Sequence, residues 1–410
     1  MQALEILAII WLLVFIASFL AHKTRFTPVL WYLFGGTVLV NFGILPQVMP
    51  DFIVTFSELG IIFIMFAIGF EEETDNFLNS LKRSWGIAFF GALAPFLITY
   101  LLVWYFWGNS TTALLCGLAM AATAVSLTMV SLKSEGLQNT PAATGIMTSA
   151  VLDSITSLTL VAILVPIALG ESALSVNGVA VIVTKAIMFF LIVTFIGSVL
   201  FPISRGFLKK TPLVSHFNLR LILAMGRGEY IVLALLLIAI LVALLAHQFG
   251  FHPAIGAYMA GLIIRREYFD FHRDQKIDFH QQAKNAIDNI AFSWIGPVFF
   301  VTLGSKLILD WNLLLAVLPE VLLLFIGLFI GQIMAASLAA HYIGHFDWPA
   351  SWMIGFGMLG RAELAFLVMD IAYVQHQLIT PDVFYTLMLT TFLLNCSVPL
   401  SIRWWKIRFS

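Results

Sequence analysis

The residue with the strongest case for chemistry in this sequence is Asp153, which lies near the middle of a long apolar segment, in the stretch TSAVLDSITSLTL. An ionisable side chain at the centre of a bilayer costs roughly 2.5–3.5 kcal/mol on insertion scales, so it needs a reason to be there. On a helix, Ser149, Thr156 and Ser157 share the face of Asp153 because of their spacing from it. Such a stripe of oxygens suits a cation, whereas a purely structural carboxylate would accept hydrogen bonds from a neighbouring helix.

A second set of polar side chains lies in the preceding apolar segment, GLAMAATAVSLTMVSLKSEG. Thr123, Ser126 and Thr128 fall in a part of this segment that has few large residues. One interpretation is a helix that unwinds inside the membrane and exposes carbonyl groups and helix ends to an ion. The other is a small-residue face that lets two helices pack closely. The composition of the segment does not decide between them.

A third segment, IGFGMLGRAELAFLVMD, combines three glycines with Arg361 and Glu363. A crossing of two broken helices needs such charges, because each can neutralise a helix end. Arg361 and Glu363 are two positions apart and cannot face each other on a regular helix, so each is expected to have a different partner. We expect this pair to have a structural role at the helix crossing, on which the ion site depends.

The rest of the chain offers little catalytic or metal-binding chemistry. Cys116 and Cys396 both lie inside apolar runs, which argues against a disulfide framework or a cysteine-ligated metal. The histidines form no ligand cluster, and no nucleophile–base pair is visible. A net charge of −1 excludes nucleic acid as a polyelectrolyte partner. We therefore expect no enzyme activity, no cofactor and no metal other than a transported cation.

The elements that position these side chains must be membrane helices, because a chain that is 61% hydrophobic and 10% charged cannot cover a soluble fold with polar surface. Runs long enough to cross about 30 Å of hydrocarbon at 1.5 Å per residue predict about thirteen transmembrane helices. Their approximate spans are 3–20, 28–44, 52–70, 83–107, 112–133, 142–169, 175–202, 228–247, 252–265, 286–306, 312–341, 347–376 and 382–404. The sequence therefore predicts an all-α, polytopic protein embedded in a lipid bilayer.

The distribution of basic residues predicts the orientation of these helices. Lys and Arg accumulate on the cytoplasmic side of membrane proteins. Most of the 21 basic residues fall on that side if the N-terminus is outside and the C-terminus is cytoplasmic. The first helix is expected to be retained, because no basic leader and no small-residue cleavage site precede it. We expect a multi-pass protein of the cell (inner) membrane.

Thirteen helices also permit an inverted-topology repeat, because helix n and helix n+7 then point in opposite directions. The stretches FSELGIIFIMFAIGF, from Phe56, and FSWIGPVFFVTLGS, from Phe292, occupy such positions. Both begin with Phe-Ser, contain an internal glycine and end near another glycine. They hint at a repeat without proving one.

Four segments together resemble the monovalent cation/proton antiporter-2 family, which includes Kef-type potassium efflux systems and bacterial sodium/proton antiporters. They are TRFTPVLWYLFGGTVLVNFGILP, FHPAIGAYMAGLIIRR, GPVFFVTLGSKL and GRAELAFLV, the last with Ala362 in a glycine position. The resemblance runs along nearly the whole chain. It implies an inverted-repeat, sodium/proton-antiporter-like fold with two crossing discontinuous helices, broken at Thr123 and near Arg361, and an ion site at Asp153.

The resemblance also implies a division of the single transmembrane unit, residues 1–410, into two parts. A mobile core that binds the ion would comprise mainly 83–169 and 312–404. Dimerisation or scaffold helices, mainly 1–70 and 175–306, would hold a homodimer together. Because the chain ends at Ser410, shortly after its last helix, we expect no soluble regulatory domain.

Two positions depart from the pattern of many sodium/proton members of that family. Where those members have paired aspartates, this chain has Asp153 followed by Ser154. Where many have a lysine, in the helix before the Arg361 segment, this chain has Gln332. The two replacements remove charges of opposite sign, which favours one-for-one, electroneutral exchange.

The function implied by the resemblance is secondary active exchange of Na⁺ or K⁺ for protons by alternating access, as in pH homeostasis. The cation and the proton would compete for Asp153, while Thr123, Ser126, Ser154 and Ser157 supply neutral oxygens. Two alternatives stay open. One is a conduit or a symporter of another solute, without proton coupling, on the same fold. The other is a membrane sensor that transports nothing.

Overall fold

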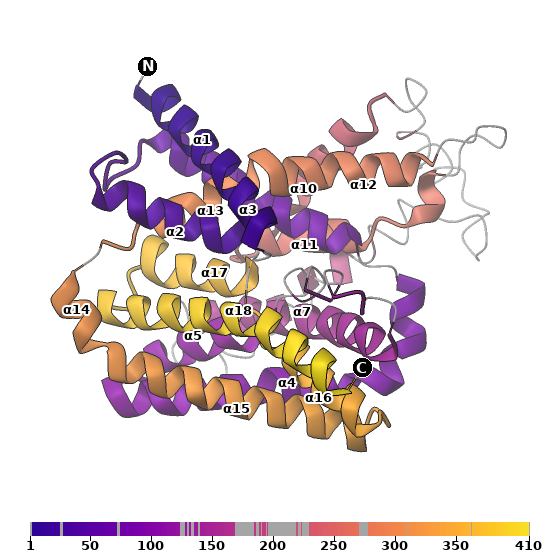
Figure 1. Ribbon diagram of the computed structural model, residues 1–410. Coiled ribbons are helices and arrows are strands. Elements are labelled where there is room, and N and C mark those ends of the chain that lie inside the picture. Colours follow the sequence, from indigo (N-terminus) through magenta and orange to yellow (C-terminus); the bar gives the residue numbers. More distant parts are fainter. Residues whose placement is uncertain are drawn as a thin grey trace. The chain divides into compact units, whose positions relative to one another are not determined.

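The computed structural model of this chain is built from helices (Figure 1). It describes residues 2–24, 28–71, 74–123, 128, 131–132, 135–137, 140–168, 229–269, 278–308, 310–361 and 363–409, together with scattered positions between 184 and 223. The chain divides into two compact units. The first comprises Met1–Val54, Asp75–Glu171 and Phe300–Ser410, and the second comprises Thr55–Thr74 and Ser172–Phe299.

The first unit contains the helices that carry Asp153 and Arg361. Its helices are α1 (Gln2–Thr24), α2 (Pro28–Asn41), α4 (Thr74–Trp107), α5 (Ser110–Ala121), α7 (Pro141–Ala168), α14 (Trp311–Ala316), α15 (Leu318–Tyr342), α16 (Trp348–Gly357), α17 (Glu363–Met369), the π-helix η5 (Asp370–Gln375) and α18 (Pro381–Phe409). Within this unit α5, α7 and α17 pack against one another, and α16 packs against α7, α15 and α18. Figure 1 shows α15 and α18 running side by side.

The second unit contains α10 (Ile231–Gln248), α11 (Pro253–Leu262), the 3₁₀-helix η3 (Arg266–Phe269), α12 (Phe279–Asn289) and the π-helix η4 (Ile290–Trp294). Two further helices, α3 (Asp51–Glu71) and α13 (Gly296–Gly304), each run from one unit into the other. In the second unit α10 packs closely against α11.

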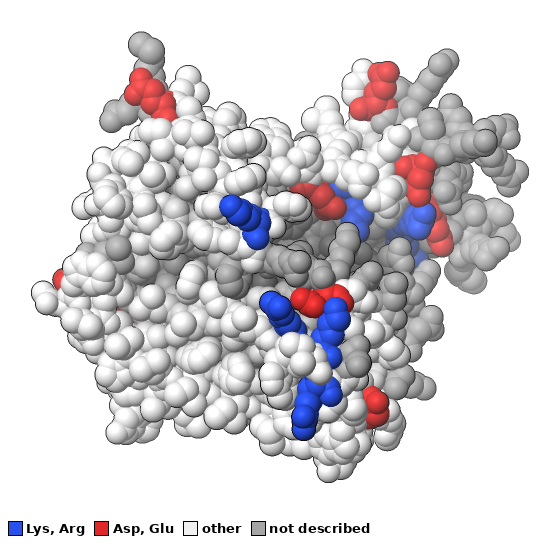
Figure 2. Space-filling model, viewed as in Figure 1, with Lys and Arg blue, Asp and Glu red and all other residues white. Residues whose placement is uncertain are grey.

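The helices have the composition of membrane spans. In the described part of the chain, seven helical segments are long and apolar enough to cross a bilayer: Ala3–Thr24, Asp51–Phe70, Ser84–Trp107, Ile231–Gln248, Phe279–Gly304, Leu318–Tyr342 and Pro381–Phe409. Large apolar side chains such as Phe15, Phe19 and Ile330 are exposed. On the face shown in Figure 2, most of the described surface carries neither basic nor acidic residues. Such a surface is stable in lipid and not in water.

The expected spans agree with these helices along most of the chain. Each of the roughly thirteen segments predicted from hydropathy overlaps a described helix, with the exception of 175–202, which lies almost entirely outside the described residues. The prediction of an all-α, multi-span membrane protein is confirmed. The predicted division into a mobile core and a scaffold concerns motion, and it stays a prediction.

Two of the predicted spans are interrupted. The first begins with α5, where the Asn109 side chain accepts hydrogen bonds from Thr111 N and Thr112 N and so caps the helix. This helix ends at Ala121, and Ala122 is extended, with φ −73° and ψ 131°. The second span begins with α16, which ends at Gly357, and continues with α17 from Glu363. Both breaks lie where the family resemblance implies them, at Thr123 and near Arg361.

The two stretches that hint at a repeat approach each other at their internal glycines. A Cβ atom on Gly60 of α3 would lie 2.8 Å from the carbonyl oxygen of Ile295 and 3.2 Å from the Cα of Gly296. Real Cβ atoms are not found this close to backbone, so the glycine is what allows the two chain segments to meet.

Candidate functional site

Asp153 lies on α7 and is fully buried, with 0% of its surface exposed. Its carboxylate nevertheless has several donors. Oδ2 accepts the main-chain N–H of Thr123 at 2.8 Å and the Thr123 hydroxyl at 2.5 Å, and Oδ1 accepts the Ser157 hydroxyl at 3.3 Å. Each of these bonds stabilises the charged form of a group that would otherwise be costly to bury.

The break after α5 provides the donors from Thr123. If the helix continued through Ala122 and Thr123, the N–H of Thr123 would bond to a carbonyl one turn earlier. Because Ala122 is extended, that N–H is free to point at the carboxylate of Asp153 instead. The unwound segment therefore makes an anion-binding position, in which Asp153 supplies the negative charge.

Ser149 adds another oxygen to the Asp153 face of α7. It lies one helical turn before Asp153 and is 0% exposed, and among the described residues its hydroxyl has no hydrogen-bond partner. Asp153, Thr123 and Ser157 form a cluster of oxygen atoms at the break of the span, and Ser149 is one helical turn from it. Carboxylate and hydroxyl oxygens are the ligands that alkali cations use in proteins.

Arg361 occupies the corresponding position at the other break. It lies between α16 and α17 and is 1% exposed. Its guanidinium donates to the carbonyl oxygens of Met358 and Gly360, both at 2.9 Å, and more weakly to that of Leu359 at 3.5 Å. These carbonyls lie at the C-terminal end of α16, where helical N–H partners are missing. The guanidinium thus closes the negative end of that helix.

Asp153 and Arg361 are matched to the two breaks by the sign of their charge. The carboxylate meets a free N–H group, and the guanidinium meets free C=O groups. The two side chains also attract each other electrostatically. In the described structure, every acceptor of a hydrogen bond from the Arg361 side chain is a neutral oxygen. Arg361 therefore forms no direct hydrogen bond with the carboxylate of Asp153.

Gln332, the residue at the position where many family members have a lysine, lies beside Arg361. It projects from α15 and is 0% exposed, and its Oε1 accepts a hydrogen bond from Arg361 Nη2 at 3.2 Å. Its Nε2 is buried without a partner in the described structure. A neutral acceptor at this position holds the guanidinium without repelling it.

The second half of the interrupted α5 span is joined to the end of α16. The hydroxyl of Thr128 donates to the carbonyl oxygen of Gly357 at 2.6 Å, and both residues are buried. This bond ties the two broken segments together, as expected for discontinuous helices that cross.

The remaining predicted residues are described only in part. Ser126 lies outside the described residues, as do the side chains of Ser154 and Glu363. Thr156 is described and is exposed, with its hydroxyl bonded to the carbonyl oxygen of Leu152, so it does not join the oxygen cluster. The structure therefore brings Asp153, Thr123 and Ser157 together at one break, and Gln332 and Arg361 at the other.

Asn395 is a residue of this region that the sequence analysis missed. It lies on α18 and is 2% exposed. Its side chain accepts a hydrogen bond from the main-chain N–H of Arg361 and donates one to the main-chain carbonyl of Arg361. The available signal was a single amide side chain within the apolar stretch FLLNCSVPL. A lone amide in a membrane helix needs partners just as a charge does.

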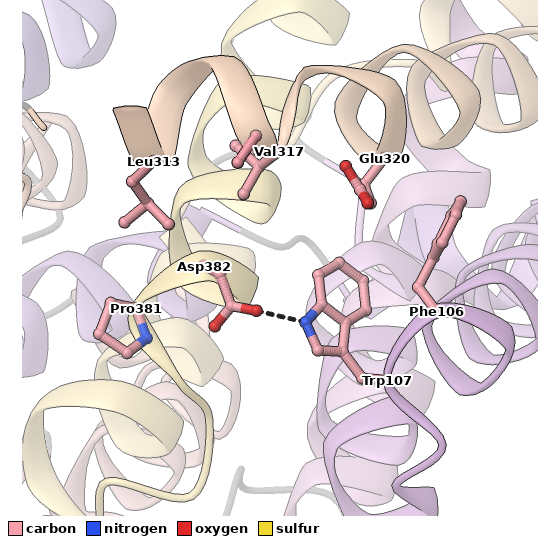
Figure 3. Close-up of a pocket in the computed structure, with 8 residues that line it drawn as sticks. Phe106, Trp107, Leu313, Val317, Glu320, Pro381 and Asp382 are labelled. Atoms are coloured by element: carbon pink, nitrogen blue, oxygen red, sulfur yellow. Dashed lines mark hydrogen bonds between the residues drawn. The ribbon is translucent and has the colours of Figure 1, made fainter. Parts of the chain in front are cut away.

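A separate pocket of about 460 Å³ lies where α4 ends and where α14, α15 and α18 begin (Figure 3). Its walls include Trp107 and Glu320, and the indole N–H of Trp107 donates to the carboxylate of Asp382. The pocket shares no residue with the Asp153 cluster. Among the described residues, no group of three His, Cys, Asp or Glu side chains could hold a metal ion.

Comparisons with known proteins agree with this architecture. Residues 9–406 match the family described as sodium/hydrogen exchanger, transmembrane. The chain is 24% identical over 344 residues to a probable Na⁺/H⁺ antiporter, GerT, of Bacillus cereus, covering 81% of this chain and 82% of the relative. It is 25% identical over 344 residues to the Na⁺/H⁺-K⁺ antiporter GerN of the same organism, covering 81% of this chain and 79% of the relative.

A third curated relative and a solved structure extend the likeness over almost the full length. The chain is 23% identical over 413 residues to a Na⁺/H⁺ antiporter of Enterococcus hirae, and the match covers 98% of each chain. Its fold is similar to that of the sodium proton antiporter MjNhaP1 from Methanocaldococcus jannaschii, with a TM-score of 0.73, 16% identity, and coverage of 98% and 97% of the two chains. The chain therefore belongs to the sodium/hydrogen exchanger family and is a multi-pass membrane transporter rather than an enzyme.

Proposed function

We propose that this protein exchanges a monovalent cation, Na⁺ or K⁺, for protons by alternating access, with Asp153 as the carboxylate that binds each in turn. The observation that carries the proposal is the buried carboxylate of Asp153 at the break of a membrane span, which accepts hydrogen bonds from Thr123 and Ser157 and has the buried Ser149 one helical turn away. The antiporter names of its curated relatives, one of which includes K⁺, support the same substrates.

The oxygen cluster explains how a cation and a proton exclude each other. A cation bound among these oxygens needs the negative charge of Asp153, and a proton on the carboxylate removes that charge. The two ligands therefore bind in alternation. The hydroxyls of Ser149 and Ser157 replace part of the hydration shell of the cation, because each offers a lone pair once its own hydrogen turns away.

The charges of this region favour one-for-one exchange. Among the described residues of the oxygen cluster, Asp153 carries the carboxylate. The residue beside Arg361 is the neutral Gln332. Arg361 is engaged at the end of α16, so its charge stays with the protein through the cycle. A site that gains one cation whenever it loses one proton moves no net charge.

We further propose a working arrangement in the membrane. The N-terminus is outside and the C-terminus is cytoplasmic, in the cell (inner) membrane, because the basic residues then face the cytoplasm. Helices within 83–169 and 312–404 form the mobile core. Helices within 1–70 and 175–306 form the scaffold of a homodimer.

Reconstitution into liposomes tests the function directly. The purified protein is placed in vesicles that contain a pH-sensitive dye, and Na⁺, K⁺ or Li⁺ is added outside at several pH values. Antiport predicts a change of luminal pH that depends on the cation and reverses with its gradient. A conduit would respond to voltage without obligatory proton movement, and a sensor would produce no flux, so either result would refute antiport.

A further inference from the structure

The side chain of Asn395, on α18, forms hydrogen bonds with both the main-chain N–H and the main-chain carbonyl of Arg361. The main-chain N–H of Arg361 donates to Asn395 Oδ1 at 2.7 Å, and Asn395 Nδ2 donates to the carbonyl oxygen of Arg361 at 2.6 Å. Both residues are buried. One side chain of α18 thus bonds to both polar groups of one residue in the break between α16 and α17.

A carboxamide is the side chain suited to this task. Arg361 lies between α16 and α17, outside helical geometry, and in the part of the chain that the structure describes its N–H and C=O groups bond to Asn395. Leaving both buried and unpaired would be costly. Asparagine carries its donor and its acceptor on two separate atoms, whereas a carboxylate offers acceptors alone and a hydroxyl has its donor and acceptor on a single oxygen. Two bonds to one residue also hold its position more tightly than one.

The position of the Arg361 backbone decides where its guanidinium can reach. At present the guanidinium bonds to the carbonyls of Met358 and Gly360 and to Gln332, all neutral, while its opposite charge Asp153 lies within electrostatic range. Among the described residues of the helices packed around Arg361, Asp153 is the charged group that acts on the guanidinium. A released guanidinium would find a stronger partner in that carboxylate than in a carbonyl.

We propose that Asn395 is a positioning residue for cation binding. It holds the backbone of Arg361 so that the guanidinium stays at the end of α16 and leaves Asp153 open to the transported cation. Without Asn395, Arg361 competes with the cation for Asp153. This inference rests on the proposed function, since it assigns Asn395 a role in cation affinity.

The test compares Asn395→Ala and Asn395→Asp with the wild-type protein in the same liposome assay. Asn395→Ala removes both bonds, so the apparent KM for the cation should rise about tenfold, while the maximal rate per folded molecule stays within about twofold, because a competing charged hydrogen bond acts on binding. Asn395→Asp keeps the acceptor for the Arg361 N–H and loses the donor to the Arg361 carbonyl, so one of the two bonds that hold the backbone remains. Its KM should therefore lie between the values of the wild-type protein and of Asn395→Ala.

A matched control comes from the same helix. Ser397 is two residues further along α18, and its hydroxyl bonds to the carbonyl of Leu394 on its own helix. Ser397→Ala removes a polar group from this stretch without touching Arg361. It should leave both the KM and the maximal rate unchanged.

Hydrogen–deuterium exchange supplies a readout that does not depend on transport. Asn395 Oδ1 is the acceptor of the Arg361 N–H, so exchange in the peptide that contains Arg361 should accelerate in Asn395→Ala and not in Ser397→Ala. Unchanged exchange there would overturn the proposal. So would faster exchange with an unchanged KM and a maximal rate that falls with the amount of folded protein, because that result describes a purely structural residue.

The two proposals fail in different ways. If the wild-type protein moves no cation against protons in liposomes, the proposed function is refuted, and with it the assignment of Asn395 to cation affinity. The deuterium-exchange comparison then still decides whether Asn395 holds the backbone of Arg361. If the wild-type protein is active and Asn395→Ala keeps its KM, only the role of Asn395 is refuted.

Discussion

The carboxylate of Asp153 accepts both the main-chain N–H and the hydroxyl of Thr123, a residue 30 positions earlier in the chain. The first bond exists because the helix that precedes Thr123 has ended, and the second because the residue at that point is a threonine. The contact therefore joins an irregular backbone to a buried charge. Four predictions follow from it and from the neighbouring contacts.

Asp153→Asn should abolish cation/proton exchange while the protein still folds. The amide is nearly isosteric with the carboxylate but carries no negative charge, so it can neither balance a cation nor release a proton. Exchange is measured with the pH dye in liposomes, and folding by thermal unfolding of the purified protein. Asp51→Asn, at an exposed position in the first turn of α3, is the control and should retain full exchange. Undiminished exchange in Asp153→Asn would remove this residue from the mechanism.

Thr123→Val should weaken cation binding without removing the main-chain bond to Asp153. Valine keeps the branched shape of threonine but lacks the hydroxyl that lies 2.5 Å from the carboxylate. We expect the apparent KM for the cation to rise roughly tenfold or more, in line with the loss of one hydrogen bond to a charged group. Thr123→Ser restores the hydroxyl and should return the KM to within about twofold of wild type. Equal KM values for the valine and serine variants would contradict this role.

Arg361→Ala should destabilise the fold itself. The guanidinium satisfies carbonyl oxygens at the end of α16, and alanine would leave them buried and unpaired. We expect a loss of about 3 kcal/mol, seen as a lower midpoint of thermal unfolding in detergent. Arg361→Lys should fall between wild type and alanine, because an ammonium group cannot span the same carbonyls. Arg403→Ala, at an exposed position of α18, is the control and should change stability by less than about 0.5 kcal/mol.

Wild-type exchange should be insensitive to membrane voltage. One cation for one proton moves no net charge, so clamping the potential of the liposomes with K⁺ and valinomycin should leave the rate of Na⁺-driven pH change unaltered. A rate that follows the voltage would contradict one-for-one exchange, because it would show that unequal numbers of protons and cations move. Li⁺ in place of Na⁺ under the same clamp checks that the result does not depend on one ion.

Most of the fold was predictable from the sequence because hydropathy is a local property. Runs of apolar residues long enough to cross a bilayer locate the helices, and the family resemblance, not composition, located the interruptions near Thr123 and Arg361. Arg361 and Glu363 were expected to have different partners, and Arg361 does bond to backbone and to Gln332. The partners themselves could not be predicted, since they depend on how neighbouring helices are rotated and aligned.

The sequence by itself determined that this protein is embedded in a membrane and that Asp153 is its most deeply placed carboxylate. These conclusions need only the composition and spacing of each segment. Only the tertiary structure decided that Asp153 meets the N–H of Thr123, that Arg361 bonds to neutral oxygens, and that Asn395 holds Arg361 from a helix 34 positions away. The physical reason is that buried polar groups take whichever partner the packed helices bring within about 3 Å, and that choice is made between segments distant in the chain.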